Sequence, residues 1–204
     1  IEGGQFDTIY HEHLRTYSLK SLLKLFSYYN FTITDVQRGD RYGGNIRVHV
    51  TKGKNKPVSE NVTRLLELEE SSGLHKLETY EKFAERVKKA KTDFLNFILK
   101  TKNDGKTIVA NSCPGRCVTL LNYYGIDSDL IPYITEQPTS LKLGMFLPGM
   151  HIPIIKNEIL LKEQPDFVIL LAWHYAEPIM KELRTQGLKS VFVIPLPDLT
   201  IVKT

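Results

Sequence analysis

The sequence predicts an α/β protein, with a Rossmann-like, doubly wound domain in its C-terminal part preceded by helices and a smaller N-terminal part. Two observations carry this prediction. From residue 107 onward, short apolar runs alternate with helical patterns, which is typical of a mainly parallel sheet covered by helices. A chain of 204 residues is also long enough for one full core and a smaller second one.

The N-terminal part reads as a strand, a helix and a hairpin. Residues 6–10 form a short extended run, and Ser18 opens a pattern in which apolar residues recur every three or four positions, as in an amphipathic helix. Residues 31–36 and 46–50 alternate apolar and polar side chains around a glycine-rich turn. Alternation around such a turn predicts two antiparallel strands.

A polar segment rich in turn-forming residues, Lys52–Pro57, follows the hairpin. Such segments favour linkers, so we expect two domains, 1–56 and 57–204. Two helices should follow, the stronger one over residues 80–98 and ending at Asn103-Asp104-Gly105. The α/β pattern then predicts strands at 107–110, 130–134, 167–172 and 191–195, and helices at 118–124 and 178–186.

Composition narrows the function classes. The net charge of +4 is spread among acidic residues, and no apolar run approaches the length of a membrane span. We therefore expect neither a nucleic-acid nor a membrane partner. Cys113 and Cys117 are the two cysteines and predict small buried residues in a reducing, cytoplasmic setting. The chain starts without Met or a signal-peptide pattern, so it is expected to begin within a longer protein.

The densest polar cluster is Tyr10-His11-Glu12-His13, which we expect at a strand end on the carboxyl edge of a sheet. A neutral His can remove a proton, a carboxylate can orient it, and a Tyr hydroxyl can donate to a developing oxyanion. These groups suit proton abstraction next to a carbonyl. Two other interpretations stay open: a surface cluster without a catalytic role, and two zinc ligands at His11 and His13.

Two further segments could bind a ligand. The turn 111–116 joins a predicted strand to a helix, where Arg116 could hold a phosphate, although Gly115 also fits a purely structural turn. The loop 148–153 carries His151, and Trp173-His174-Tyr175 follows the most apolar strand. Aromatic side chains there could stack on a base or a sugar, or form a hydrophobic lid.

Together these segments resemble the three-part sugar C-methyltransferases that act on keto intermediates of nucleotide-linked deoxysugars. The matching stretches occur in family order: 6–14, 43–48, 119–126, 148–154 and 170–173. The resemblance implies that residues 1–56 are the end of a methyltransferase domain that binds S-adenosylmethionine. It places that cofactor's glycine-rich loop, and a separate zinc-binding domain, outside this chain.

The resemblance also implies roles for individual residues. His13 would remove the proton at sugar C3, beside the C4 ketone, while Tyr10 and Glu12 position the substrate and stabilise the enolate. The expected substrate-binding residues are His11, Arg116, Asn122, His151, Trp173 and His174. The substrate would be a nucleotide-sugar, such as one linked to thymidine diphosphate. The chain departs from the family at Ser112–Cys117, where Arg replaces a Lys and small residues are lost, which changes the geometry and bulk of this turn.

Two other functions compete with this one. The C-terminal domain could be a non-catalytic module that binds or scaffolds a nucleotide-sugar. A metal-dependent hydrolase using His11 and His13 would need further ligands that do not stand out in the sequence. No metal site is therefore predicted in this chain, and the chain alone is expected to be inactive in methyl transfer. The sequence makes no prediction about oligomeric state.

Overall fold

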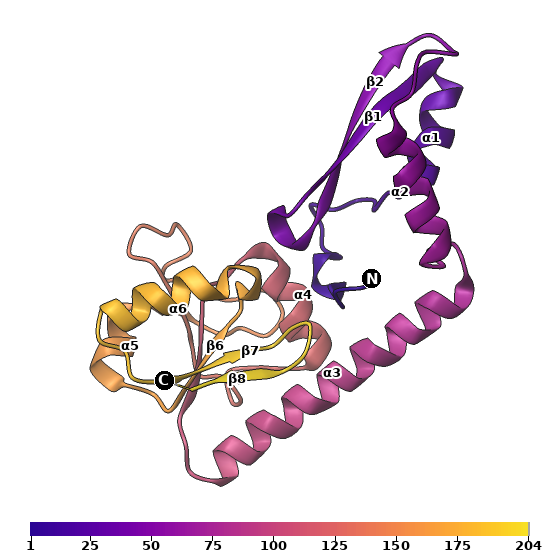
Figure 1. The fold of residues 1–204 in the computed structure, drawn as a ribbon. Helices are drawn as coiled ribbons and strands as arrows, with labels where there is room; N and C mark the ends of the chain where they lie inside the picture. The colour runs from indigo at the N-terminus through magenta and orange to yellow at the C-terminus, as the bar shows by residue number, and fades with distance from the viewer. Residues whose placement is uncertain (204) are drawn as a thin grey trace. The chain divides into compact units, whose positions relative to one another are not determined.

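A computed structural model describes residues 1–203. The chain divides into two compact units: Ile1–Glu12 joined with the chain from Ala84 onward, and His13–Phe83. Helix α3 (Leu77–Asn103) is continuous across the second division and can be followed as one helix in Figure 1. Its end at Asn103 is the one predicted from the Asn-Asp-Gly sequence.

The smaller unit packs two helices on a hairpin. It contains α1 (Leu19–Tyr28), β1 (Phe31–Gly39), β2 (Asn45–Lys52) and α2 (Glu60–Ser71), with β1 and β2 antiparallel. The turn between the strands is a single 3₁₀ turn, η2 (Arg41–Gly43). These elements confirm the predicted helix and hairpin. The core of the unit is formed by Leu19, Ile33, Val36 and Val62.

The larger unit is built on a six-stranded sheet. Its strands are β3 (Ile108–Asn111), β4 (Ile134–Glu136), β5 (Ile154–Lys156), β6 (Phe167–Leu170), β7 (Val191–Ile194) and β8 (Thr200–Val202). They lie in the order β5-β4-β3-β6-β7-β8, and all neighbours are parallel except β7 and β8. This is the strand order of a Rossmann-type sheet, so the predicted doubly wound fold is confirmed.

The helices of this unit are α4 (Gly115–Tyr124), α5 (Glu158–Glu163) and α6 (Ala176–Thr185). Figure 1 shows α5 and α6 beside the sheet, where Leu160 and Leu183 join a buried cluster with Val109, Val168 and Phe192. Alternate strand residues point to opposite faces of a sheet. One face of β3, β6 and β7 is therefore covered by α5 and α6.

Helix α3 packs against other elements of this unit through aromatic rings. The Phe94 and Tyr124 rings, on α3 and α4, have centroids 5.5 Å apart, and both side chains are almost fully buried. Phe97 meets Phe167 at the start of β6 edge-on, at 5.3 Å. The amphipathic pattern that predicted this helix therefore reflects packing within the unit.

Two predicted strands are wrong. Residues 6–8 form a 3₁₀ turn, η1 (Phe6–Thr8), because the Thr8 hydroxyl donates to the Gln5 carbonyl and closes the chain locally. Strand β4 begins at Ile134 and not at residue 130. A turn closes at residue 131, where Ile131 N donates to the Asp127 carbonyl, and Pro132 follows it without an N–H to share with a neighbouring strand.

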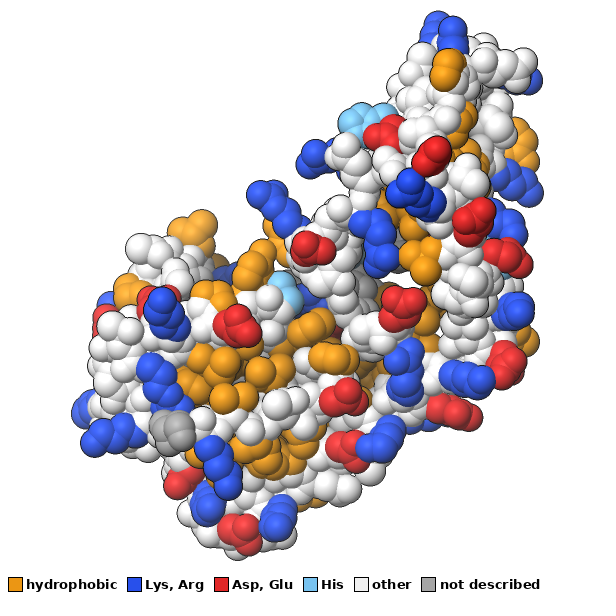
Figure 2. All heavy atoms as spheres, in the orientation of Figure 1, with side chains coloured by type: hydrophobic (Ala, Val, Ile, Leu, Met, Phe, Trp, Pro, Cys, Tyr) orange, Lys and Arg blue, Asp and Glu red, His pale blue; other side chains and the backbone are white. Residues whose placement is uncertain are grey.

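The described surface mixes both signs of charge. Figure 2 shows Lys and Arg side chains interspersed with Asp and Glu over the face that it draws. Within residues 1–203, no helix is long and apolar enough to cross a membrane.

Candidate active site at the carboxyl edge of the sheet

The direction of the strand order reverses at β3. The chain leaves β3 for β4 on one side and later returns to β6 on the other. In open α/β sheets, ligands bind outside the carboxyl ends of the strands at such a switch point. Here those ends lead into the turn 112–114 before α4 and into η3 (Trp173–Tyr175), so these two segments mark the candidate site.

An ion pair between Asp7 and Arg116 lies at the switch point. Arg116 Nε donates to Asp7 Oδ2 at 2.7 Å and Nη2 donates to Oδ1 at 2.6 Å, which makes the contact bidentate. The exposed fraction is 0% for Asp7 and 5% for Arg116. The guanidinium that the sequence offers to a phosphate is thus bonded to a carboxylate of the same chain.

Two residues of η3 complete this cluster. Trp173 Nε1 donates to Asp7 Oδ2 at 2.8 Å, and the Arg116 guanidinium lies 4.7 Å from the centroid of the Trp173 ring. His174 Nδ1 is 3.5 Å from Arg116 Nη1, at the long limit of a hydrogen bond. Burial first, and then the positive charge of Arg116, lower the pKa of His174, while Asp7 opposes the shift.

The segment that carries Asp7 packs along α4. Phe6 is buried, and its ring centroid lies 5.4 Å from that of Tyr123 and 5.6 Å from that of Tyr124. The Thr119 hydroxyl donates to the Ile9 carbonyl at 2.9 Å. The residues immediately before the Tyr-His-Glu-His cluster are therefore fixed to α4 by aromatic packing and a hydrogen bond.

The first residue of the cluster lies at the beginning of α4. A Cβ built on Gly115 would be 3.1 Å from Tyr10 Cε2, so the ring lies close to the helix backbone at its first residue. Tyr10 is half-buried, whereas His11, Glu12 and His13 are exposed. The division between the two units falls between Glu12 and His13.

Polar side chains hold the turn after β3. Asn111 is buried and donates from Nδ2 to Thr135 Oγ1 and to Asn157 Oδ1, both at 2.9 Å. Cys113 N donates to Glu136 Oε1 at 2.7 Å. Ser112 has a φ of 68°, a conformation that the surrounding hydrogen bonds must maintain. The turn is therefore a structured polar network.

The two cysteines lie next to this network. Cys113 and Cys117 are free and buried, as expected, with their Sγ atoms 3.6 Å apart. The hydrogen bond between the thiols lowers the pKa of Cys113 and raises that of Cys117, which burial raises further.

The loop 148–153 is tied to α4 by Asn122. Asn122 Nδ2 donates to the Val118 carbonyl at 2.8 Å and to the Pro148 carbonyl at 2.9 Å. His151 is exposed and has a φ of 52°. In the sequence it lies between Leu147 and Ile152, whose side chains are buried. Asn122 thus positions the loop that carries His151, and substrate contacts of both residues stay a prediction.

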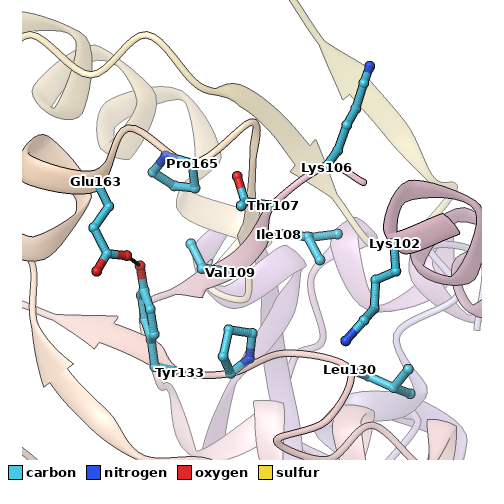
Figure 3. A pocket seen from close by; sticks show the side chains of 10 residues that line it. Lys102, Lys106, Thr107, Ile108, Val109, Leu130, Tyr133, Glu163 and Pro165 are labelled. Carbon is cyan, nitrogen blue, oxygen red and sulfur yellow. Dashed lines mark hydrogen bonds between the residues drawn. The ribbon is translucent and has the colours of Figure 1, made fainter. Parts of the chain in front are cut away.

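A separate cavity of about 270 Å³ lies where β3 begins. Figure 3 shows the Tyr133 hydroxyl bonded to Glu163 in its wall, with Thr107 and Val109 nearby. Because β3 and β6 are parallel and both begin beside this cavity, it lies at the amino edge of the sheet. None of the predicted site residues lines it.

The structure brings several predicted residues together and adds others. Tyr10, Arg116, Trp173 and His174 gather at the switch point, whereas Asn122 and His151 belong to the neighbouring loop contact. Sequence reasoning missed Asp7, Gln5, Asn111 and Glu136. An acidic residue at the end of the second strand, such as Glu136, is a recognisable Rossmann signal. Within residues 1–203, no group of three or more His, Cys, Asp or Glu side chains is placed to hold a metal ion.

Comparison with known proteins agrees with this architecture. The profile of the C-methyltransferase C-terminal domain family matches residues 40–197. C-methyltransferase NovU from Streptomyces niveus is 32% identical over 206 residues, an alignment that covers 99% of this chain and 48% of the relative. The chain therefore spans about half the length of this relative. On both grounds, this chain belongs to the C-methyltransferase C-terminal domain family.

Proposed function

We propose that the protein containing this chain is an S-adenosylmethionine-dependent C-methyltransferase that acts on a nucleotide-linked keto-deoxysugar. The observation that carries the proposal is the place of the Tyr-His-Glu-His cluster. Tyr10 is fixed at the first residue of α4, on the carboxyl edge of a Rossmann-type sheet, and His11 and Glu12 of the same unit are exposed. This is where α/β proteins present catalytic groups to a ligand.

The proposed chemistry begins with proton removal. A neutral imidazole of His13 takes the proton from sugar C3, beside the C4 ketone, and the C–H electron pair becomes the enolate. Tyr10 and Glu12 position the sugar and stabilise the negative charge that develops on the ketone oxygen. His11, His151, Asn122, Trp173 and His174 belong to the proposed substrate surface. Arg116 acts through its contact with Asp7.

S-adenosylmethionine supplies the electrophilic methyl group when it is bound. In a Rossmann domain a cofactor would bind at the turn after the first strand, but here Cys113 N is bonded to Glu136 and Asp7 fills the space beside Arg116. The residues present do not fit the cofactor. We therefore assign its site to the part of the protein outside this chain, and the chemistry of these residues ends at the enolate.

Hydrogen exchange at the sugar carbon tests the base directly. The full-length protein is incubated in D₂O with a thymidine-diphosphate-linked 4-keto-deoxysugar and S-adenosylhomocysteine, which has no methyl group to donate. Wild-type protein should incorporate deuterium at C3, and His13→Asn should slow incorporation by about 100-fold or more. His49→Asn is the matched control, because His49 is an exposed histidine on β2.

The exchange experiment also separates the alternative function. If wild-type protein binds the nucleotide-sugar but incorporates no deuterium and transfers no methyl group, the chain is part of a binding or scaffolding module. Equal exchange rates for His13→Asn and wild type would assign the base to another residue.

A further inference from the structure

We infer that Asp7 and Arg116 are positioning residues. They fix Tyr10, the first residue of the Tyr-His-Glu-His cluster, against the switch point of the sheet. The inference rests on the proposed function. The ion pair does not contact the reacting atoms. It affects kcat because it holds Tyr10 in position.

Asp7 and Arg116 meet with a specific geometry. Both carboxylate oxygens of Asp7 receive a bond from Arg116, at 2.6 and 2.7 Å, across a sequence separation of 109 residues. A bidentate contact fixes orientation as well as distance, because the guanidinium presents its N–H groups in a rigid fork. The contact therefore constrains both the distance and the orientation of the Asp7 carboxylate relative to Arg116 on α4.

The burial of the pair has an energetic cost. Burying an ion pair costs desolvation that offsets most of the Coulomb attraction, so such pairs contribute little net stability compared with well-packed apolar residues. Asp7 and Arg116 have side-chain exposures of only 1% and 6%. Stability alone is therefore a weak reason for this pair, whereas a specific geometry is a sufficient one.

Neighbouring side chains hold the pair in the same geometry. Trp173 Nε1 also donates a hydrogen bond to Asp7 Oδ2, at 2.8 Å, and the guanidinium of Arg116 lies over the Trp173 ring. Gln5 Oε1 accepts from Arg116 Nη2 at 3.3 Å. The carboxylate thus has partners from both strand ends of the switch point, β3 through α4 and β6 through η3.

Asp7 also lies close in sequence to the Tyr-His-Glu-His cluster. Only Thr8 and Ile9 separate Asp7 from Tyr10, and both are held by hydrogen bonds, from Thr8 Oγ1 to the Gln5 carbonyl and from Thr119 to the Ile9 carbonyl. A displacement of Asp7 is therefore transmitted to the Tyr10 ring at Gly115. Misplacing a catalytic group by about 1 Å can cost about 100-fold in rate.

The test compares Asp7→Asn and Arg116→Lys in the full-length protein with wild type. Asn removes the charge of the acceptor, and Lys keeps the positive charge but loses the fork. Each variant should lower kcat for methyl transfer by about 10- to 100-fold, with an unchanged KM for S-adenosylmethionine. Asp93→Asn is the control, because Asp93 forms an ion pair with Lys89 on the surface of α3.

Hydrogen–deuterium exchange of the backbone over residues 5–12 gives a readout that does not need turnover. Both variants should lose more protection there than in β6 and α6, and Asp93→Asn should match wild type. Unchanged protection with Asp7→Asn overturns the inference, as does a kcat that stays at the wild-type value. If wild-type protein shows no methyl transfer, the proposed function fails, and the exchange data still decide whether the pair positions the segment.

Discussion

The Tyr10 ring lies so close to Gly115 that a single added methyl group would come within 3.1 Å of its Cε2 atom. Gly115 is the first residue of α4 and its φ is not positive, so alanine is sterically allowed by the backbone. The space beside this glycine is therefore occupied by the first residue of the motif.

Gly115→Ala should lower the kcat of the full-length enzyme with little change in stability, because the new methyl group pushes the Tyr10 ring away from α4. Gly105→Ala should lower stability and leave kcat unchanged. Gly105 has a φ of 70° and nothing within 4 Å of an added Cβ, so alanine there costs about 1–2 kcal/mol of stability without touching the motif. Steady-state kinetics and urea unfolding measure the two effects. Equal kcat values for both variants would contradict the assigned contact.

Glu69→Ala should destabilise the smaller unit. Glu69 is buried on α2, and its carboxylate accepts the backbone N–H groups of Leu19 at 2.5 Å and Lys20 at 3.1 Å, at the start of α1. Removing this acceptor leaves the buried N–H of Leu19 unsatisfied, at a cost of about 1–3 kcal/mol.

The neighbouring change Glu70→Ala is the control, since Glu70 lies on the same helix and is exposed, with one long contact to Lys20 at 3.5 Å. It should cost at most about 1 kcal/mol. Denaturant unfolding and the exchange rates of the first amides of α1 measure both variants. Equal destabilisation would show that Glu69 does not act as a cap.

Gly149→Ala should destabilise the loop that carries His151 more than Gly144→Ala does. Both glycines have positive φ values, 85° and 79°, so each alanine costs about 1–2 kcal/mol in backbone strain. At Gly149 the added Cβ would also overlap Asn122 Oδ1, whereas at Gly144 it meets nothing within 4 Å. Thermal unfolding ranks the two, and a larger loss for Gly144→Ala would refute the packing argument.

Stability should fall as the pH drops below about 6.5, the ordinary pKa of histidine. Burial and Arg116 hold the pKa of folded His174 below that value. Between the two pKa values the unfolded chain binds more protons than the folded one, so acidification favours unfolding. The stabilising contribution of neutral His174 is fully present above the pKa of His174 in the unfolded chain. It is lost as the pH falls toward the pKa of His174 in the folded protein.

The check is the melting temperature of wild type and His174→Gln at pH 7.5 and pH 5.5. The melting temperature of wild type should fall further on acidification than that of His174→Gln. The carboxylates that also titrate, including Asp35 with its lowered pKa, are common to both proteins. Parallel losses would assign the pH dependence to other groups.

Local sequence patterns predicted the helices and strands that are determined by neighbouring residues in the chain. Helix α1 begins where Ser18 was expected to open it, because the Ser18 hydroxyl accepts from Ser21 N. The buried strands β3, β6 and β7 were visible as apolar runs. The strands β5 and β8 were missed because each has only three residues, which is too short to show a period.

The candidate site was only partly predictable. The strand ends that carry Arg116, Trp173 and His174 follow from the α/β alternation, whereas the contact of Arg116 with Asp7 joins residues 109 positions apart. No local pattern encodes such a pairing. Sequence reasoning therefore assigned a free guanidinium to a phosphate, while the folded chain supplies its own carboxylate.

The bidentate pair also joins the start of this chain to the larger unit. The family match starts at residue 40, and a protein expressed from there would lack Asp7 and leave the Arg116 charge buried without a counter-ion. Removing one partner of a buried pair costs about 3–5 kcal/mol, a large share of the stability of a typical domain. The stretch matched by the family profile therefore leaves out the twelve residues at the start of the chain that belong to the larger unit.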